Sequence, residues 1–167
     1  DADLSKLPIF QGGFINFGYW PNPLLENEKI TIDQRIACSK EMYRVVGSLA
    51  GILKQHSIVD IGSGLGYGSS FFLQQYQPKL VVGLDISPEQ IARAKKYHAS
   101  EISAGKLRFT IGEAESMPFA ERSFDRVLSV EAAQHFTSIP AFSKEVSRIL
   151  KPGGKLVMTS FFPTNEE

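Results

Sequence analysis

The chain has 167 residues, 43% of them hydrophobic and 22% charged, which is the composition of an ordinary globular domain with a buried core. Eighteen basic and eighteen acidic residues cancel to a formal net charge of zero, so charge gives no reason to expect nucleic acid or an anionic membrane as a partner. No apolar run reaches the roughly 20 residues that span a bilayer. The single cysteine, Cys38, cannot form an intramolecular disulfide. These features predict a cytoplasmic protein.

The first 30 residues are rich in glycine, proline and aromatic side chains and keep neither helical nor strand periodicity for long. Two interpretations of this segment stay open. It is either a loop packed against the domain or a mobile flap over a ligand, because amphipathic Tyr and Trp side chains close pockets well. We therefore divide the chain into a cap segment, residues 1–30, and a domain, residues 31–167.

From Thr31 onward, apolar residues at helical spacing alternate with short apolar runs that are typical of buried strands. The clearest helix start is Ser87-Pro88, where a capping serine precedes a proline at the first helical position. His56, in a connection, and His98, on a helix, are expected to be solvated. In chain order the pattern predicts a helix at 31–53, a strand at 58–61, a helix at 66–77, a strand at 80–86, a helix at 87–103, strands at 107–111 and 124–130, a helix at 139–150 and a strand at 155–162.

Strands that alternate with helices indicate right-handed crossovers and an α/β fold, a Rossmann-like doubly wound, mostly parallel sheet of about five strands. Ligands of such sheets bind outside the carboxyl ends of the strands, near the point where the strand order reverses. A glycine-rich turn, residues 62–66, follows the first strand, and Asp85 ends the second, 19 residues after Gly66. This spacing predicts a nucleotide-like ligand whose ribose hydroxyls bond to Asp85. No basic residue follows Asp85 to hold a 2'-phosphate, which disfavours NADP.

Four strings in order, at 59–66, 83–87, 112–119 and 150–156, together resemble the class I S-adenosylmethionine-dependent methyltransferases. The resemblance covers about residues 31–162. The strings at 16–20 and 131–136 are similar to the small-molecule branch of that family, which includes sugar, sterol and tocopherol methyltransferases. The resemblance implies S-adenosylmethionine as cofactor and a small-molecule acceptor. No metal is expected, because the three histidines stand far apart and no metal-ligand spacing appears.

Position by position, the resemblance also implies a set of cofactor-binding residues. Asp85 would hold the ribose and Ile86 would lie beside the adenine. Glu113 stands where the family usually has an aspartate that reaches the adenine amine, and the backbone of Ala114 would assist it. Tyr19 and Trp20 match flap residues that close over the cofactor, and Ser129, near the end of the fourth strand, would lie close to it. The residues expected around the methionine part are Asp60, Gly62, Ser63, Gly64 and Gly66.

Methyl transfer needs an in-line approach of a nucleophile to a sulfonium methyl group, so positioning and exclusion of water supply much of the acceleration. If the acceptor is a hydroxyl, a base must take its proton, and histidine is the side chain best matched to neutral pH. His135 is the only histidine placed just past the fourth strand, and a packed structural histidine is the alternative. Glu131 would bind the cofactor or orient His135 or the acceptor, unless it is a plain structural cap.

The family's sheet normally has seven strands, so a five-stranded chain implies part of a longer enzyme that lacks the last two strands. Exposed Phe161 and Phe162 at a raw sheet edge would then favour self-association through that edge. Three alternatives remain: a cofactor-binding fragment without activity, lipid methyl transfer as in cyclopropane fatty acid synthases, and an NAD-dependent oxidoreductase. The oxidoreductase would share the glycine turn and Asp85, but it leaves the strings at 112–119 and 150–154 unexplained.

Overall fold

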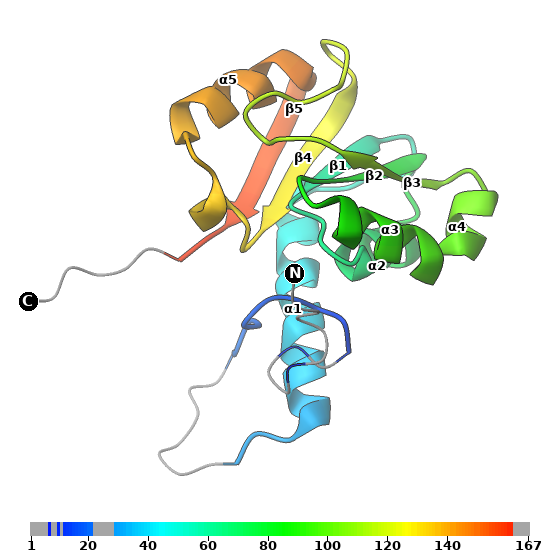
Figure 1. Ribbon diagram of the computed structural model, residues 1–167, viewed down its shortest axis with the longest axis vertical. Helices are drawn as coiled ribbons and strands as arrows, with labels where there is room; N and C mark the ends of the chain where they lie inside the picture. Colours follow the sequence, from blue (N-terminus) through cyan, green and yellow to red (C-terminus); the bar gives the residue numbers. More distant parts are fainter. Residues whose placement is uncertain (1–6, 8–9, 11, 22–28, 162–167) are drawn as a thin grey trace, which may run out of the picture.

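The computed structural model describes residues 7, 10, 12–21 and 29–161, and the expectations for Phe162 and for most of residues 1–11 lie outside these ranges. Five strands form one sheet in the order β3-β2-β1-β4-β5, and each neighbouring pair is parallel (Figure 1). The α/β, doubly wound sheet predicted from the sequence is confirmed. The strands are β1 (Ser57–Ile61), β2 (Leu80–Asp85), β3 (Leu107–Ile111), β4 (Phe124–Val130) and β5 (Leu150–Thr159).

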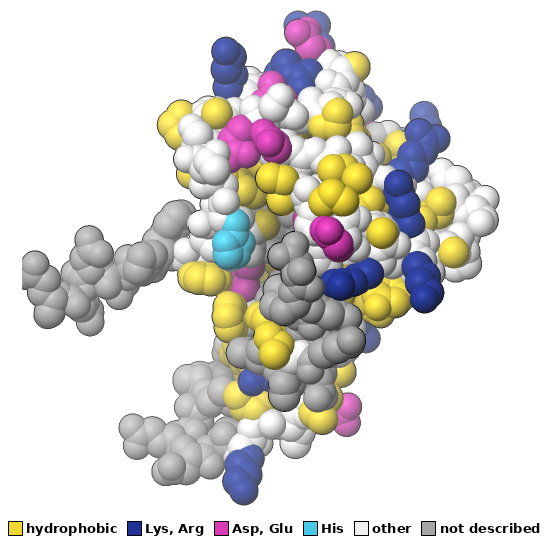
Figure 2. All heavy atoms as spheres, viewed as in Figure 1, with side chains coloured by type: hydrophobic (Ala, Val, Ile, Leu, Met, Phe, Trp, Pro, Cys, Tyr) yellow, Lys and Arg dark blue, Asp and Glu magenta, His cyan; other side chains and the backbone are white. Residues whose placement is uncertain are grey.

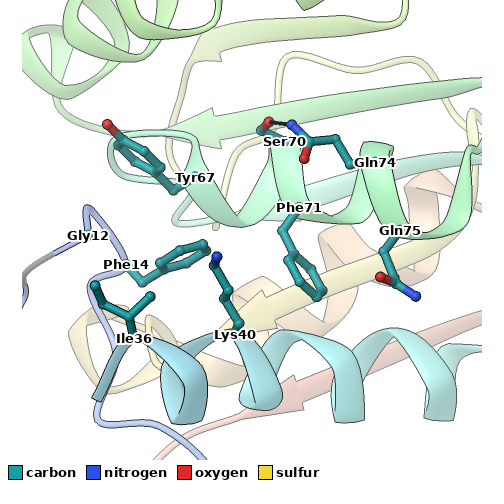
Figure 3. A pocket seen from close by; sticks show the side chains of 9 residues that line it. All are labelled: Gly12, Phe14, Ile36, Lys40, Tyr67, Ser70, Phe71, Gln74 and Gln75. Carbon is teal, nitrogen blue, oxygen red and sulfur yellow. Dashed lines mark hydrogen bonds between the residues drawn. The ribbon is translucent and has the colours of Figure 1, made fainter. Parts of the chain in front are cut away.

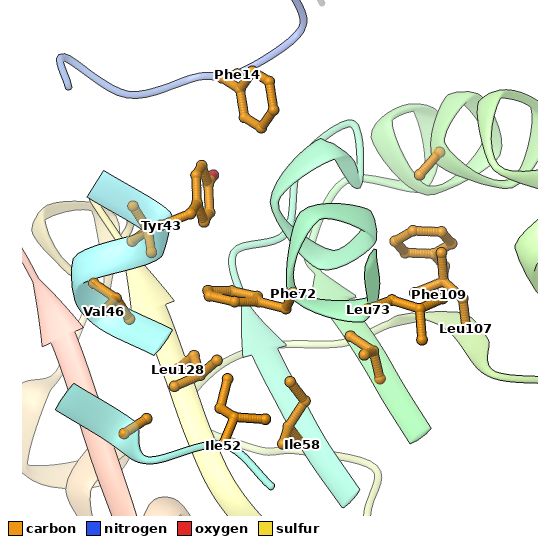
Figure 4. Packing of buried hydrophobic residues seen from close by; sticks show 14 of the residues in the cluster. Phe14, Tyr43, Val46, Ile52, Ile58, Phe72, Leu73, Leu107, Phe109 and Leu128 are labelled. Atoms are coloured by element: carbon orange, nitrogen blue, oxygen red, sulfur yellow. The ribbon is translucent and has the colours of Figure 1, made fainter. Parts of the chain in front are cut away.

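Helices cover both faces of the sheet, because successive residues of each strand point to opposite faces and both sets are apolar. Side chains of α1, α2 and α3 pack with Ile58 and Leu128 on one face (Figure 4). Side chains of α5 pack with Val59 and Val127 on the other face. The helices are α1 (Ile32–Ala50), α2 (Tyr67–Tyr76), α3 (Pro88–Tyr97), α4 (Ala99–Ser103), the short 3-10 helix η3 (Ala133–His135) and α5 (Ile139–Ile149).

The predicted helix starts at Thr31 and Ser87 are both present. Thr31 and Gln34 form a reciprocal capping box at the start of α1. The Ser87 hydroxyl accepts the Gln90 amide at 3.3 Å at the start of α3. Each cap satisfies a backbone N–H that has no partner inside its helix, so these boundaries follow from local sequence alone.

Several boundaries differ from the sequence-based expectation, among them the end of α1, which lies at Ala50 rather than at residue 53. The helix expected at 87–103 breaks at His98, which separates α3 from α4. The last helix ends at Ile149, and the strand expected to start at Lys155 already pairs at Leu150. The pairing then shifts between Phe124 and Arg126, so that the intervening Lys-Pro-Gly-Gly string bulges out of the ladder.

Both histidines expected in solvent are instead buried, His56 to 8% exposure and His98 to 5%. His56 Nδ1 accepts the Leu53 amide at 3.1 Å, and the His56 carbonyl accepts the Lys79 amide at 2.9 Å. The connection before β1 is therefore packed between α1 and the start of β2. The expectation of a solvated loop was wrong because a buried polar side chain close to a strand can form its hydrogen bonds with backbone groups instead of water.

Candidate active site

A glycine turn follows β1 at the point where the strand order reverses, between β1 and β4. The amides of Gly62 and Ser63 both donate to the Leu84 carbonyl at the end of β2, at 2.8 and 2.9 Å. The Gly66 amide donates back to the Ser63 carbonyl at 2.9 Å. These backbone bonds hold the turn against the sheet. We call Gly62–Gly66, together with Asp60 and Asp85, the cradle.

Two glycines of the cradle permit close packing, and a third leaves space open. A Cβ built on Gly62 would lie 2.3 Å from Ala132 Cβ, and one built on Gly66 would lie 2.3 Å from the Phe109 ring. A Cβ built on Gly64 would meet only Ile15 Cδ1, at 3.6 Å. Space for a ligand therefore lies above Gly64, as expected where a backbone must approach a nucleotide closely.

Asp85 links the cradle to the helix that follows β2. Its Oδ2 accepts the Gly64 amide at 2.8 Å, and its Oδ1 accepts the Ser87 amide at 2.9 Å. A carboxylate offers about four lone-pair positions. Two backbone bonds therefore leave capacity for two ribose hydroxyls. The next side chain, Ile86, is 66% exposed, so an apolar surface is available beside the carboxylate.

Asp60 is a buried carboxyl group in β1, only 2% exposed. Its Oδ2 accepts the Ser69 hydroxyl at 2.7 Å. Burial raises the pKa of Asp60 to about 6, the Ser69 hydrogen bond lowers it, and the negative charge of Asp85 raises it further. A negative charge kept in so little water would attract a cationic group of a ligand strongly.

Two buried hydroxyl groups near the carboxyl ends of the strands, Ser63 Oγ and Ser129 Oγ, have no hydrogen-bond partner within the described ranges. Unpaired buried polar groups are rare, and a bound ligand or water commonly satisfies them. At the end of β3, the Gly112 amide donates to the Asp85 carbonyl at 3.0 Å, which holds the following loop against β2. In that loop Glu113 is exposed and Ala114 is buried.

The cap segment crosses the cradle as a short strap, residues 12–21. Phe14 is buried against Tyr43 and Tyr67, with ring centroids 5.6 and 5.8 Å away. Asn16, 1% exposed, donates to the Ser39 carbonyl at 3.3 Å and accepts the Gly18 amide at 2.8 Å. Of the two interpretations of this segment, packing against the domain holds for Phe14 and Asn16, and Phe17 and Tyr19 remain exposed.

The strap residue that lies over Gly64 is Ile15, which the sequence did not single out. Tyr19 is 44% exposed, and its amide donates to the Cys38 carbonyl of α1 at 2.9 Å. The Trp20 indole donates to the Phe17 carbonyl at 2.8 Å. Tyr19 and Trp20 thus belong to the strap that crosses the cradle, and their hydrogen bonds go to α1 and to the strap itself.

A cavity of about 510 Å³ lies on the other side of the strap, between Phe14, α1 and α2 (Figure 3). Its walls combine aromatic rings with the Lys40 ammonium group, which is 5.8 Å from the centre of the Phe14 ring. None of the residues predicted to bind the cofactor lines this cavity. The cavity is therefore separate from the cradle, with Phe14 of the strap in one of its walls and Ile15 facing Gly64.

Glu131, directly after β4, joins the strap to the sheet. Its backbone adopts a left-handed conformation with φ of 49°, and its amide donates to the Thr159 carbonyl of β5 at 3.0 Å. Its Oε2 accepts the Phe17 amide at 2.8 Å. Burial raises the pKa of Glu131, and the bond from Phe17 opposes that rise. A non-glycine residue in this conformation is uncommon and is often found at functional sites.

His135 closes η3 beyond Glu131 and has an exposed side chain. Its position past the carboxyl end of β4 is the one expected from the sequence. No hydrogen bond joins His135 to Glu131 in the described part of the chain, so the two predicted catalytic residues share an edge of the sheet without forming a pair.

His98 contacts the cradle although the sequence offered no motif for it. Its Nε2 lies 3.1 Å from the Leu65 carbonyl, and because a carbonyl only accepts, the ring nitrogen must be the donor. Burial lowers the pKa of His98, which favours the neutral ring. The break between α3 and α4 occurs at this residue, where its ring packs inward beside Tyr67 and Phe109.

The cradle fits S-adenosylmethionine in two respects: open space at Gly64 and a carboxylate with free lone pairs at Asp85. Within the described ranges, no three His, Cys, Asp or Glu side chains are grouped as metal ligands. No helix among the described residues is long and apolar enough to cross a membrane.

Comparison with known proteins identifies the family. A profile described as methyltransferase domain matches residues 59–158. Erythromycin 3''-O-methyltransferase of Saccharopolyspora erythraea is 31% identical over 153 residues, which are 92% of this chain and 47% of that protein. Sterol 24-C-methyltransferase of Pneumocystis carinii is 38% identical over 105 residues, which are 63% of this chain and 28% of that protein.

Solved structures agree on the fold. The crystal structure of a putative sarcosine dimethylglycine methyltransferase from Galdieria sulphuraria superposes with a TM-score of 0.77 at 22% identity, over 91% of this chain and 56% of that one. The chain spans about half the length of the curated relatives that it matches. The family match covers the β1 turn, Asp85 and both ends of β4. The chain therefore belongs to the class I S-adenosylmethionine-dependent methyltransferases.

Proposed function

We propose that this chain binds S-adenosylmethionine in the cradle and takes part in methyl transfer to a hydroxyl group of a small, partly apolar molecule. The observation that carries the proposal is the convergence of the open space at Gly64, the Asp85 carboxylate and the strap at one edge of the sheet. Because the chain belongs to a methyltransferase family, the NAD-dependent oxidoreductase alternative is no longer supported. The names of two relatives, an O-methyltransferase of erythromycin and a fatty-acid O-methyltransferase, support transfer to oxygen on a molecule with apolar bulk.

In this proposal each part of the cradle has one task. Asp85 holds the ribose with the lone pairs left free by Gly64 and Ser87, and Ile86 lies against the adenine. Glu113 and the Ala114 backbone approach the adenine edge, and Ser129 supplies a hydroxyl near the methionine part. Asp60 and the turn of Gly62, Ser63, Gly64 and Gly66 surround the methionine part.

The cofactor supplies an electrophilic methyl group on a sulfonium sulfur. The chain contributes position and a dry environment. Ile15 and the rest of the strap, Tyr19 and Trp20 included, cover the cradle and exclude water, and Glu131 holds the strap in place through Phe17. His135, exposed beside the mouth of the site, accepts the proton of the acceptor hydroxyl as a general base.

Cofactor binding is tested first by titrating the protein with labelled S-adenosylmethionine and, separately, with NAD. We expect saturable binding of the first and none of the second. Asp85→Ala should lower the affinity at least tenfold, since two ribose hydrogen bonds to a charged group contribute about 1.5 kcal/mol or more each. Identical binding by the wild type and Asp85→Ala would refute the proposed cradle.

The role of His135 is tested on the same chain with a cell extract as the source of acceptors and mass spectrometry as the readout of label transfer. His135→Ala should keep cofactor affinity and lose transfer, by about 10²-fold or more for a general base. Unchanged turnover would remove His135 as base and would indicate a carbon or amine acceptor. Binding without transfer by the wild type would favour a cofactor-binding module.

We further propose that the chain self-associates through the free edge of β5. This strand has a partner on one side only within the described sheet, and an unpaired strand edge is a template for another chain. Sedimentation over a wide concentration range should reveal dimers. A clean monomer throughout would argue against this association.

A further inference from the structure

We propose that Phe17 and Phe161 form an acceptor platform, a pair of aromatic rings on which an uncharged, largely hydrocarbon methyl acceptor binds. The inference rests on the proposed function, because it names the class of molecule that receives the methyl group. Phe17 comes from the strap and Phe161 from the chain just after β5. Their ring centroids are 5.5 Å apart with an interplanar angle of 78°, an edge-to-face pair. Both side chains are about half exposed, at 45% and 49%.

The platform is held in place by contacts from several parts of the chain. The Phe17 amide donates to Glu131 Oε2 at 2.8 Å, and the Phe17 carbonyl accepts the Trp20 indole N–H at 2.8 Å. The Phe10 ring packs edge-to-face on Phe17 with centroids 5.9 Å apart. Exposed aromatic rings that are fixed before a ligand arrives lose little entropy on binding, which favours a role in recognition.

The platform lies at the edge of the sheet where the acceptor has to enter. Glu131 follows β4, and its amide donates to Thr159, the last residue of β5, two positions before Phe161. The strap passes beside the carboxyl ends of β4 and β5 (Figure 1). His135 lies on the short helix that follows Glu131. An acceptor body on the two rings would therefore have its reactive end near Glu131 and His135.

The charge around the platform selects against anions. Glu131 is the charged side chain bonded directly to Phe17, and no Lys or Arg of the described chain forms an ion pair with it. In Figure 2, hydrophobic and acidic side chains lie near the histidine on this face, and basic side chains gather mainly on the far right and at the top. A carboxylate or phosphate on the acceptor would face Glu131 in a partly dry environment, so a neutral acceptor binds better.

Trp20 provides a built-in reporter, because it is the only tryptophan of the chain and its indole bonds to Phe17. The protein is titrated at neutral pH, with its cofactor bound, with two probes that share a ring and differ in charge: cyclohexylmethanol and cyclohexanecarboxylate. We expect the alcohol to change the Trp20 fluorescence at a concentration at least about fivefold lower than the carboxylate. Equal or tighter binding of the carboxylate would overturn the inference.

Variants locate the probe on the rings. Phe161→Ala removes one ring, keeps the hydrogen bonds of Phe17 to Glu131 and Trp20, and should weaken binding of the alcohol by about fivefold, the range expected for one aromatic contact. Leu49→Ala is the matched control, because Leu49 is a large exposed apolar side chain of α1, at 65% exposure, and should have no effect. Equal losses in the two variants would refute the platform. Cofactor affinity is measured separately for each protein. Loss of cofactor binding would count against the cradle. Normal cofactor binding together with unchanged alcohol binding in Phe161→Ala would count against the platform alone.

Discussion

The cradle and the strap are neighbours that are held by different kinds of contact. The cradle is fixed mainly by backbone hydrogen bonds to β2, with one further bond from the Gly64 amide to the Asp85 carboxylate, and by glycines that allow contact at Ala132 and Phe109. The strap is fixed mainly by side chains, with Phe14 and Asn16 buried and the Glu131 carboxylate bonded to the Phe17 amide, and one backbone bond joins Tyr19 to Cys38. In the proposed function, the cofactor side is therefore built mainly from backbone geometry and the acceptor side mainly from side chains.

The largest effect is expected from a methyl group added to the cradle. In Gly66→Ala, the new Cβ would lie 2.3 Å from the Phe109 ring at a residue with φ of 78°. The clash and the left-handed conformation together should lower the free energy of unfolding by about 3 kcal/mol. Gly105→Ala is the matched control, because φ is 74° there but nothing lies within 4 Å. It should cost about 1 kcal/mol. Urea unfolding measures the free energy of unfolding of both variants, and equal losses would mean that packing does not constrain the turn.

A second large effect is expected from the buried charge of Asp60. Because the pKa of Asp60 is raised from 3.8 to about 6, the folded protein binds the proton more tightly, and stability falls as pH rises from about 4 to about 6. Asp60→Asn keeps an acceptor for Ser69 and removes the charge. It should be more stable above pH 6, by up to about 3 kcal/mol, and should bind the cationic cofactor more weakly. Thermal unfolding across that pH range tests the prediction on stability, and cofactor titration tests the prediction on affinity. A variant that is less stable than the wild type at every pH would contradict the prediction on stability.

A smaller effect is expected from His98, which supports the cradle from behind. His98→Leu removes the donor to the Leu65 carbonyl and should lower cofactor affinity about tenfold, the equivalent of one buried hydrogen bond. His98→Gln places an amide donor at a similar reach and should stay within about twofold of the wild type. Calorimetric titration with the cofactor distinguishes the two. If Gln and Leu are equally impaired, the ring acts through packing beside Tyr67 and Phe109 rather than through its hydrogen bond.

Much of the cradle could be predicted from the sequence because each part leaves a local signature. Glycines mark the turn, Asp85 ends an apolar run at a fixed distance, and Ser87-Pro88 marks the helix that follows. His98, Ile15 and the Phe17–Phe161 pair could not be predicted, since each depends on a contact between residues far apart in the chain. No Pro or Gly marks the helix break at His98, and an exposed phenylalanine has the same sequence pattern as a buried one.

The smallest effect is expected where the strap meets Glu131. Glu131→Ala leaves the Phe17 amide without its carboxylate acceptor and should speed hydrogen exchange of residues 12–21 by about fivefold, the equivalent of about 1 kcal/mol. Glu131→Gln keeps an oxygen acceptor and removes the charge, so it should stay near the wild type. Burial raises the pKa of Glu131 when the strap is closed over it, so the closed strap binds the proton more tightly than an open strap would. Exchange in the strap, after correction for intrinsic rates, should therefore fall as pH falls and the carboxyl group is protonated, and it should stay flat in Glu131→Gln. The cradle peptide, residues 60–66, should be unaffected in both variants, because its backbone bonds go to β2. If exchange in the cradle rises as much as in the strap, the two regions form one unit, and the division between a cofactor side fixed by backbone and an acceptor side fixed by side chains fails.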